Sequence, residues 1–140
     1  MKIDIAKLSE DREIEFLEAW DARKYDLDVP GLIYETPLKI RVLVKKESGL
    51  AIAKIAVSAK TRWTCSRCFK EFETSFDKTF RLVYSLDLVQ KVISLDDDIR
   101  EELILNYLPK ILCQPDCRGL CPRCGADLNE SVCKCKRNEL

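Results

Sequence analysis

The sequence of 140 residues contains no histidine. This absence removes the commonest general base, the Cys–His nucleophile pair and every imidazole metal ligand. No stretch approaches the ~20 consecutive apolar residues that a membrane-spanning helix needs. Residues 1–15 mix acids and bases, where a secretory signal would be apolar. These absences argue against ordinary hydrolase chemistry and against membrane insertion, and they predict a cytoplasmic protein.

Length and composition predict one globular domain with a small appendage. Hydrophobic residues make up 46% of the chain and charged residues 34%, which is a typical balance for such a domain. A chain of this size buries roughly two thirds of its unfolded surface and can form a core without cross-links. The eight cysteines therefore need an explanation other than stapling a small fold.

Charge is balanced overall but not along the chain. There are 24 basic and 24 acidic residues. Residues 36–85, however, contain 11 basic and 4 acidic residues, an excess of +7. Such a cluster is typical of a nucleic-acid-binding surface, and equally of the solvated face of a sheet. The two interpretations stay open at this point.

Three segments with alternating polarity predict an antiparallel β-meander. They run over residues 38–45, 50–63 and 72–84, and Glu47-Ser48-Gly49 supplies a turn between the first two. Alternation places the apolar residues on one buried face. These residues are Leu38, Ile40, Val42, Val44, Ala51, Ala53, Ile55, Val57, Ala59, Thr61, Trp63, Phe72, Phe76, Phe80, Leu82 and Tyr84. We expect weaker strands at residues 1–5 and 13–16, although Ser9 could instead begin a helix.

A single helix is predicted after the meander. Asp96 is the expected N-cap, with Asp97 and Asp98 in the first turn. An apolar stripe then ends before Pro109; it consists of Ile99, Leu103, Ile104, Tyr107 and Leu108. We expect this helix to cover the open face of the sheet. The fold class is therefore α+β: an antiparallel β-sheet meander with one covering helix and a C-terminal Cys-rich, zinc-ribbon-like appendage.

Two other features have structural interpretations. We interpret Trp20 and Trp63 as core aromatics and not as a base-stacking platform. The run Asp96 to Asp98 is more simply a helix start than a magnesium site.

The cysteines form four close pairs, which are Cys65/Cys68, Cys113/Cys117, Cys121/Cys124 and Cys133/Cys135. Tetrahedral zinc takes four thiolates at about 2.3 Å, and two closely spaced cysteines can present both sulfurs from one turn. In the turn Cys121-Pro122-Arg123-Cys124-Gly125, proline fixes the bend and glycine tolerates positive φ. Each such metal-binding turn is called a knuckle. The turn from Cys65 to Phe69 lacks that glycine, so we expect it to be a weaker knuckle. The pattern indicates two structural Zn²⁺ sites of four cysteines each, with no ligand position left open for catalysis.

Zinc has two chemical alternatives. A disulfide framework conflicts with a reducing cytoplasm, and a bridge within Cys133-Lys134-Cys135 would close a small, strained ring. The spacing of Cys117, Cys121 and Cys124 matches the iron–sulfur motif of radical S-adenosylmethionine enzymes. Those enzymes need a barrel of roughly 250 residues, which this chain cannot supply.

The pairing of the four cysteine pairs is less determined. Loop-closure entropy separates the alternatives by only ~0.3 kcal/mol. The segment between Cys124 and Cys133 can form a hairpin through Gly125 and Asn129. We therefore assign Cys65, Cys68, Cys113 and Cys117 to site one, and Cys121, Cys124, Cys133 and Cys135 to site two. This predicts a β-sheet domain over residues 1–112 and a zinc-binding tail over residues 113–140, packed on the domain through Cys65 and Cys68.

The order of these motifs resembles the YceD family of bacteria and plastids, also called DUF177. The residues that carry the resemblance are, in order, Cys65-x-Arg67-Cys68 after a strand, Leu108-Pro109 at a helix end, Cys113, Cys117-x-Gly119-Leu120-Cys121-Pro122-x-Cys124-Gly125, Leu128-Asn129 and Cys133-x-Cys135. The resemblance spans roughly residues 38–136. It implies a non-enzymatic factor in large ribosomal subunit biogenesis and in accumulation of 23S ribosomal RNA, and it identifies no contact residue.

If ribosomal RNA is the partner, we expect basic side chains on one strand face and on the knuckles to contact phosphates. These candidates are Lys39, Arg41, Lys54, Lys60, Arg62, Arg118, Arg123, Lys134 and Lys136. A ribosomal or assembly protein is the alternative partner. A further alternative is a redox switch, in which oxidation releases zinc and exposes an apolar surface. No small-molecule substrate is expected.

Overall fold

The computed structural model describes residues 1–86, 91–105, 111–133 and 135. Its elements, in chain order, are β1 (Lys2–Asp4), the 3-10 turn η1 (Ile5–Lys7), β2 (Ile14–Trp20), β3 (Leu32–Tyr34), β4 (Leu38–Glu47), β5 (Leu50–Thr64), β6 (Glu71–Ser85), β7 (Val92–Ser94) and α1 (Asp96–Leu105). The predicted α+β class is confirmed, because the described chain is mostly antiparallel sheet with one α-helix.

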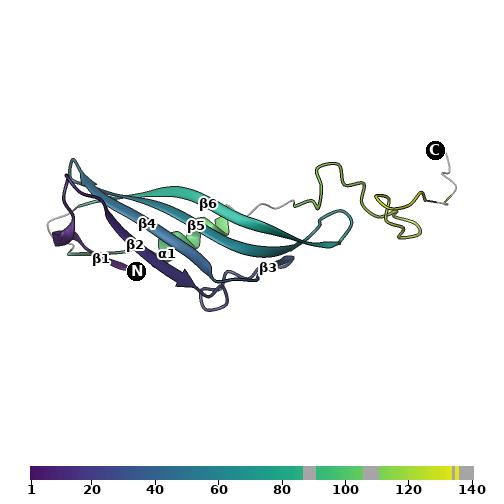
Figure 1. Ribbon diagram of the computed structural model, residues 1–140, viewed down its shortest axis with the longest axis horizontal. Helices are drawn as coiled ribbons and strands as arrows, with labels where there is room; N and C mark the ends of the chain where they lie inside the picture. Colours follow the sequence, from purple (N-terminus) through teal and green to yellow (C-terminus); the bar gives the residue numbers. More distant parts are fainter. Residues whose placement is uncertain (87–90, 106–110, 134, 136–140) are drawn as a thin grey trace.

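The predicted meander forms the main sheet. β4 pairs with β5 and β5 pairs with β6, both antiparallel. β2 extends the sheet beyond β4, and β3 continues the same edge of β5. Glu47 pairs with Leu50, so Ser48 and Gly49 alone form the β4–β5 turn, with φ of 50° and 77°. Positive φ at both turn residues gives a hairpin whose twist matches that of its strands. Figure 1 shows the resulting long, twisted sheet.

The alternating residues face the core as predicted. Leu38, Ile40, Val42 and Val44 of β4 are each at most 1% exposed. The same alternation runs along β5 from Ala51 to Trp63. The half-buried residues Phe76, Phe80, Leu82 and Tyr84 of β6 pack against this core, whereas Phe72 packs against the buried cysteines at the end of the sheet. Trp20 and Trp63 are 1% and 4% exposed, which confirms that neither forms an exposed stacking platform.

The amino-terminal segment is extended, as expected. β1 and β2 occupy the two weakly alternating stretches, and in the described chain Ser9 begins no helix. Three elements were not predicted: the turn η1, the strand β3, and the strand β7, which pairs with β1 in a separate two-stranded sheet. The segments around β3 and β7 show no alternating pattern in the sequence, so periodicity gives no signal for these two short strands.

Helix α1 packs on the buried face of the sheet, as predicted. Ile99 and Leu103 are buried in the same core as β4 and β5, and Figure 1 places α1 against that face. The predicted N-cap is wrong by one residue, because the Leu95 carbonyl accepts the first helical hydrogen bond, from Ile99 N–H at 2.9 Å. Asp96 instead lies in the first turn, where its carboxylate contacts the amino group of Met1.

One member of the predicted apolar stripe is misplaced. Ile104 is 38% exposed, because it follows the buried Leu103 directly and each helical residue turns by about 100°. The stripe residues Tyr107 and Leu108, and Pro109, lie outside the described residues.

Polar contacts also fix the helix: Tyr84 donates its hydroxyl proton to Asp98, and Lys78 Nζ donates to the Glu102 carbonyl at 2.6 Å. Within the described ranges, no helix has the length and apolar character needed to span a bilayer.

Candidate metal centres

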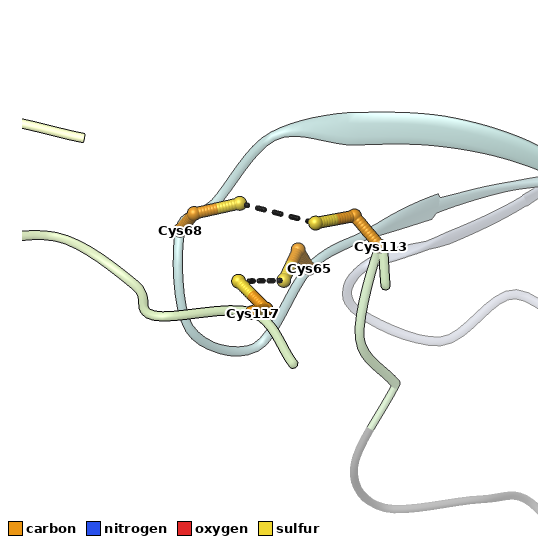
Figure 2. Close-up of side chains that lie close together, drawn as sticks. All are labelled: Cys65, Cys68, Cys113 and Cys117. Atoms are coloured by element: carbon orange, nitrogen blue, oxygen red, sulfur yellow. Dashed lines mark hydrogen bonds between the residues drawn. The ribbon is translucent and has the colours of Figure 1, made fainter. Parts of the chain in front are cut away.

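The structure gathers the first four cysteines at the turn between β5 and β6. Cys65 and Cys68 lie in this turn, and Cys113 and Cys117 approach from the tail (Figure 2). The Sγ atoms of Cys65 and Cys117 are 3.6 Å apart, as are those of Cys68 and Cys113. All four ligand atoms lie within 4.8 Å of one another. We call this group site one.

The remaining four cysteines form a second group, site two, within the tail. The Cys133 Sγ atom lies 3.5 Å from that of Cys124 and 3.2 Å from that of Cys121. Cys135 completes the set within the same 4.8 Å limit. The grouping is the one that we preferred from the sequence.

The sulfur geometry fits a tetrahedral metal ion. Four sulfurs at about 2.3 Å from a tetrahedral ion lie about 3.8 Å apart, whereas a disulfide brings two sulfurs to about 2.0 Å. The closest distances, from 3.2 to 3.6 Å, are near the first value, and all eight cysteines are free thiols. A donor set of sulfur alone favours zinc or iron over magnesium or calcium. Both groups can therefore hold a metal ion.

The pKa values of the thiols differ within each group. Burial opposes ionisation of Cys65, but backbone N–H groups of Cys68 and Cys113 outweigh it and lower the pKa of Cys65 to about 6. Burial and the neighbouring thiols raise the pKa of Cys113 to about 12. Site two repeats this contrast: backbone N–H groups lower the pKa of Cys121 to about 6, while Cys133 and Cys124 raise that of Cys135 to about 12. In each group one thiolate thus forms readily, whereas the thiol whose pKa is raised to about 12 loses its proton only beside a positive charge.

The two knuckles share one backbone geometry. The Cys65 carbonyl accepts from Phe69 N–H at 3.0 Å, and the Cys121 carbonyl accepts from Gly125 N–H at 2.9 Å. Both residues after the second cysteine are left-handed, with φ of 59° at Phe69 and 73° at Gly125. Phenylalanine thus adopts the left-handed conformation that glycine tolerates more easily. Its ring is 66% exposed, so little packing compensates for the strain.

The tail is held to the β5–β6 turn by contacts beside the cysteines. Arg67 Nη1 donates to the Cys117 carbonyl at 2.8 Å, and Ser66 N–H donates to the Ile111 carbonyl at 2.8 Å. Gly119 has φ of 76°, and a Cβ atom there would lie 3.1 Å from the Arg67 carbonyl oxygen. Glycine is therefore required at this close approach.

The sequence does not predict the contact that Asn129 makes beside site one. Asn129 was noted as a turn residue, but its side-chain Nδ2 donates to Cys117 Sγ at 3.4 Å. Its position in the Leu128-Asn129 motif was the one available signal. Sequence spacing could not show that a residue between site two ligands contacts a ligand of site one.

The predicted basic residues of the sheet share its outward face, but most are ion-paired. Arg41 pairs with Glu15, and Lys54 lies 4.0 Å from Glu13. Arg62 pairs with two acids, Glu35 and Glu73. In the part of the chain that the structure describes, Lys39 and Lys60 have no acidic partner. Of the knuckle candidates, Arg118 and Arg123 are exposed, and Lys134 and Lys136 lie outside the described residues.

Two shallow hollows adjoin on this outward face. The larger, of ≈ 580 Å³, crosses β2, β4, β5 and β6 over a floor that includes Ala56 and Ser58. The smaller, of ≈ 230 Å³, contains Lys60. Lys39 and Asp77 line both hollows. Small side chains on the central strands leave this depression, and its charge is mixed.

Comparison with known proteins finds relatives of the cysteine-rich part of the chain. The family model described as "Large ribosomal RNA subunit accumulation protein YceD" matches residues 53–140. A large ribosomal RNA subunit accumulation protein YCED homolog 1, chloroplastic, of Arabidopsis thaliana is 37% identical over 49 residues, which are 35% of this chain and 15% of that relative. The protein of the same name from Zea mays is 43% identical over 47 residues, 33% of this chain and 16% of the relative.

The aligned parts thus cover 15% and 16% of these plant relatives' own lengths. No solved structure matches the chain. The family model, by contrast, covers more than half of the chain and includes β6, α1 and all eight cysteines. The chain therefore belongs to the YceD family.

Proposed function

We propose that this chain is a non-enzymatic factor in the accumulation of large ribosomal subunit RNA, and that it works in the cytoplasm. The observation that carries the proposal is the family match over residues 53–140, which includes both four-cysteine groups. The names of the two plant relatives support it. Closed sets of four thiols organise structure and leave no coordination position for a substrate, which supports a binding role.

We propose further that each group holds one Zn²⁺ ion. The sulfur spacing and the all-thiol donor set support zinc. In this proposal residues 1–112 form the β-sheet domain, and residues 113–140 form a tail that metal at site one fastens to it. Structural zinc contributes on the order of 10–16 kcal/mol in small zinc domains, so the tail should lose its structure without the metal.

The proposed partner is the RNA itself, bound through phosphates on the outward face of the sheet. Of the five candidate cations there, Lys39 and Lys60 have no acidic partner among the described residues, and both line the hollows. The exposed ion pairs of Arg41, Lys54 and Arg62 are worth at most about 1 kcal/mol each, so phosphates can replace their acidic partners. Arg118 and Arg123, and the remaining candidates Lys134 and Lys136, would extend this surface along the tail.

The test is RNA binding by the zinc-loaded chain at several salt concentrations. A large-subunit ribosomal RNA fragment should bind less tightly as salt rises, with a slope of about −0.7 per phosphate contact on single-stranded RNA. Lys39→Glu with Lys60→Glu should weaken binding at least tenfold. Lys91→Glu with Lys24→Glu, which changes charge equally outside this surface, should have little effect.

Two results would contradict this mode of binding. Affinity that is unchanged between low and moderate salt would exclude phosphate contacts. Co-purification of a ribosomal or assembly protein that the Lys39→Glu, Lys60→Glu variant still retains would assign the role to a protein contact elsewhere.

A further inference from the structure

We propose that Asn129 couples the two four-cysteine sites, so that metal bound at either site raises the metal affinity of the other. The inference rests on the proposed metal occupancy of both sites. It concerns how the two sites communicate, which neither the family match nor the cysteine spacing addresses.

Asn129 belongs to site two by position and to site one by contact. It lies in the loop between Cys124 and Cys133, two ligands of site two. Its side-chain Nδ2 nevertheless donates to Sγ of Cys117, a ligand of site one, at 3.4 Å. The side-chain Oδ1 accepts from the backbone N–H of Arg118 at 2.9 Å. Because a backbone N–H can only donate, this contact fixes the amide with Nδ2 toward the sulfur.

The loop that presents Asn129 is short and internally hydrogen-bonded. Asn129 N–H donates to Asp127 Oδ1 at 2.9 Å, and Ser131 N–H donates to the Asp127 carbonyl at 3.0 Å. Leu128 N–H donates to the Gly119 carbonyl at 2.9 Å. Because cysteines of site two flank this loop on both sides, a metal ion at site two fixes both ends and thereby holds the Asn129 amide against Cys117.

A second contact joins the same loop to site one but is weaker. Lys70 Nζ lies 3.1 Å from Glu130 Oε1, and Lys70 follows Cys68 by two residues. Both side chains are more than 60% exposed, at 62% and 67%. Ion pairs as exposed as this contribute little, since water and salt screen them. The amide–sulfur contact, which is partly buried, is therefore the stronger candidate for the coupling.

An N–H group pointed at a ligating sulfur stabilises its thiolate form. Four thiolates around one divalent cation carry a net charge of −2, and a donor hydrogen bond offsets part of it. Removing hydrogen-bond partners of metal ligands typically lowers metal affinity by 10- to 100-fold. Linkage makes the effect reciprocal: whatever site two contributes to the affinity of site one, site one contributes equally to site two.

The experiment measures metal affinity at site one in the full chain. Co²⁺ is titrated first, because its absorption reports tetrahedral thiolate ligation, and Zn²⁺ then displaces it. Cys124→Ser with Cys133→Ser disables site two and should weaken site one by 10- to 100-fold. Asn129→Ala in the intact chain should produce a loss of similar size. The combined variant should lose little more, because both changes remove the same contact.

Two further variants isolate the amide donor. Asn129→Asp keeps the acceptor for Arg118 N–H but faces Cys117 with a carboxylate, so it should weaken site one more than Asn129→Ala does. Ser131→Ala is the matched control, since Ser131 Oγ bonds only the Asp127 carbonyl, at 3.2 Å, among the described contacts. It should leave the affinity of site one unchanged.

The outcomes separate this inference from the proposed zinc sites. A wild-type chain that takes up no metal stoichiometrically would overturn the zinc proposal and this inference with it. A wild-type chain that binds two metal ions, while Asn129→Ala matches Ser131→Ala, would overturn the coupling alone. Fully additive losses in the combined variant would also overturn it, because Asn129 would then act independently of site two.

Discussion

Site one and site two use the same knuckle in different settings. The knuckle of site one follows a strand of 15 residues, and its Cys65 meets a sulfur 52 residues along the chain. In site two, Cys121 meets Cys133 only 12 residues away. Cys65, Cys68 and Cys117 are buried, whereas Cys124 is exposed. Site one therefore brings together two segments that are distant in the sequence, whereas site two lies within one local loop.

This contrast predicts different consequences of losing one ligand. Cys117→Ser should empty site one and release the tail from the β5–β6 turn. The free energy of unfolding should fall by several kcal/mol, because structural zinc sites contribute on the order of 10–16 kcal/mol. Cys124→Ser should disorder the loop of site two and leave site one occupied, although more weakly. Hydrogen exchange with mass spectrometry measures both effects.

In that measurement Cys117→Ser should remove protection in the β5–β6 turn and over residues 111–131, while central β4 stays protected. Cys124→Ser should remove protection over residues 120–133 and leave the β5–β6 turn protected. Identical exchange maps for the two variants would show that the sites do not differ in the way described.

Two glycines with similar backbone conformations sharpen the comparison. Gly119 and Gly125 have φ of 76° and 73°, but only at Gly119 would a Cβ atom meet a described neighbour within 4 Å, the backbone of Arg67. Gly125→Ala should cost about 1–2 kcal/mol from left-handed strain alone. Gly119→Ala should cost more, because it also pushes the tail away from the knuckle of site one. Thermal unfolding of the metal-loaded variants measures the difference, and equal losses would mean that the close approach contributes nothing.

The smallest expected effect concerns Phe69. Phe69→Gly should raise the free energy of unfolding by up to about 1 kcal/mol, because glycine tolerates the left-handed conformation. The gain is limited, because glycine also increases the conformational entropy of the unfolded chain. Phe69→Ala keeps the strain and serves as the control; it should not stabilise the chain. Denaturant unfolding of both variants decides between them, and destabilisation by glycine would show that the exposed ring packs in the folded protein.

The sequence predicts the parts of the fold that have long periodic patterns. β4, β5 and β6 alternate over enough residues to reveal both their existence and their buried face. The three-residue strands β3 and β7 carry no such pattern, and their pairing depends on where the long strands bring them. Ile104 is apolar but exposed, because apolar character alone does not fix which side of a helix a residue faces.

The candidate sites show the same division. Cysteine spacing indicates four pairs and suggests which of them combine. The left-handed Phe69 and the reach of Asn129 to Cys117 follow from the folded backbone and have no counterpart in residue spacing. The acidic neighbours of Arg41 and Lys54 likewise come from the amino-terminal segment, and only the pairing of β2 with β4 brings them to the basic face.

Metal stoichiometry and ligation in the purified chain test the central claim most directly. Elemental analysis should give two zinc ions per chain, and X-ray absorption should show each surrounded by four sulfurs at about 2.3 Å. A chain that carries no stoichiometric metal, or whose eight thiols are cross-linked when isolated under reducing conditions, would contradict the account.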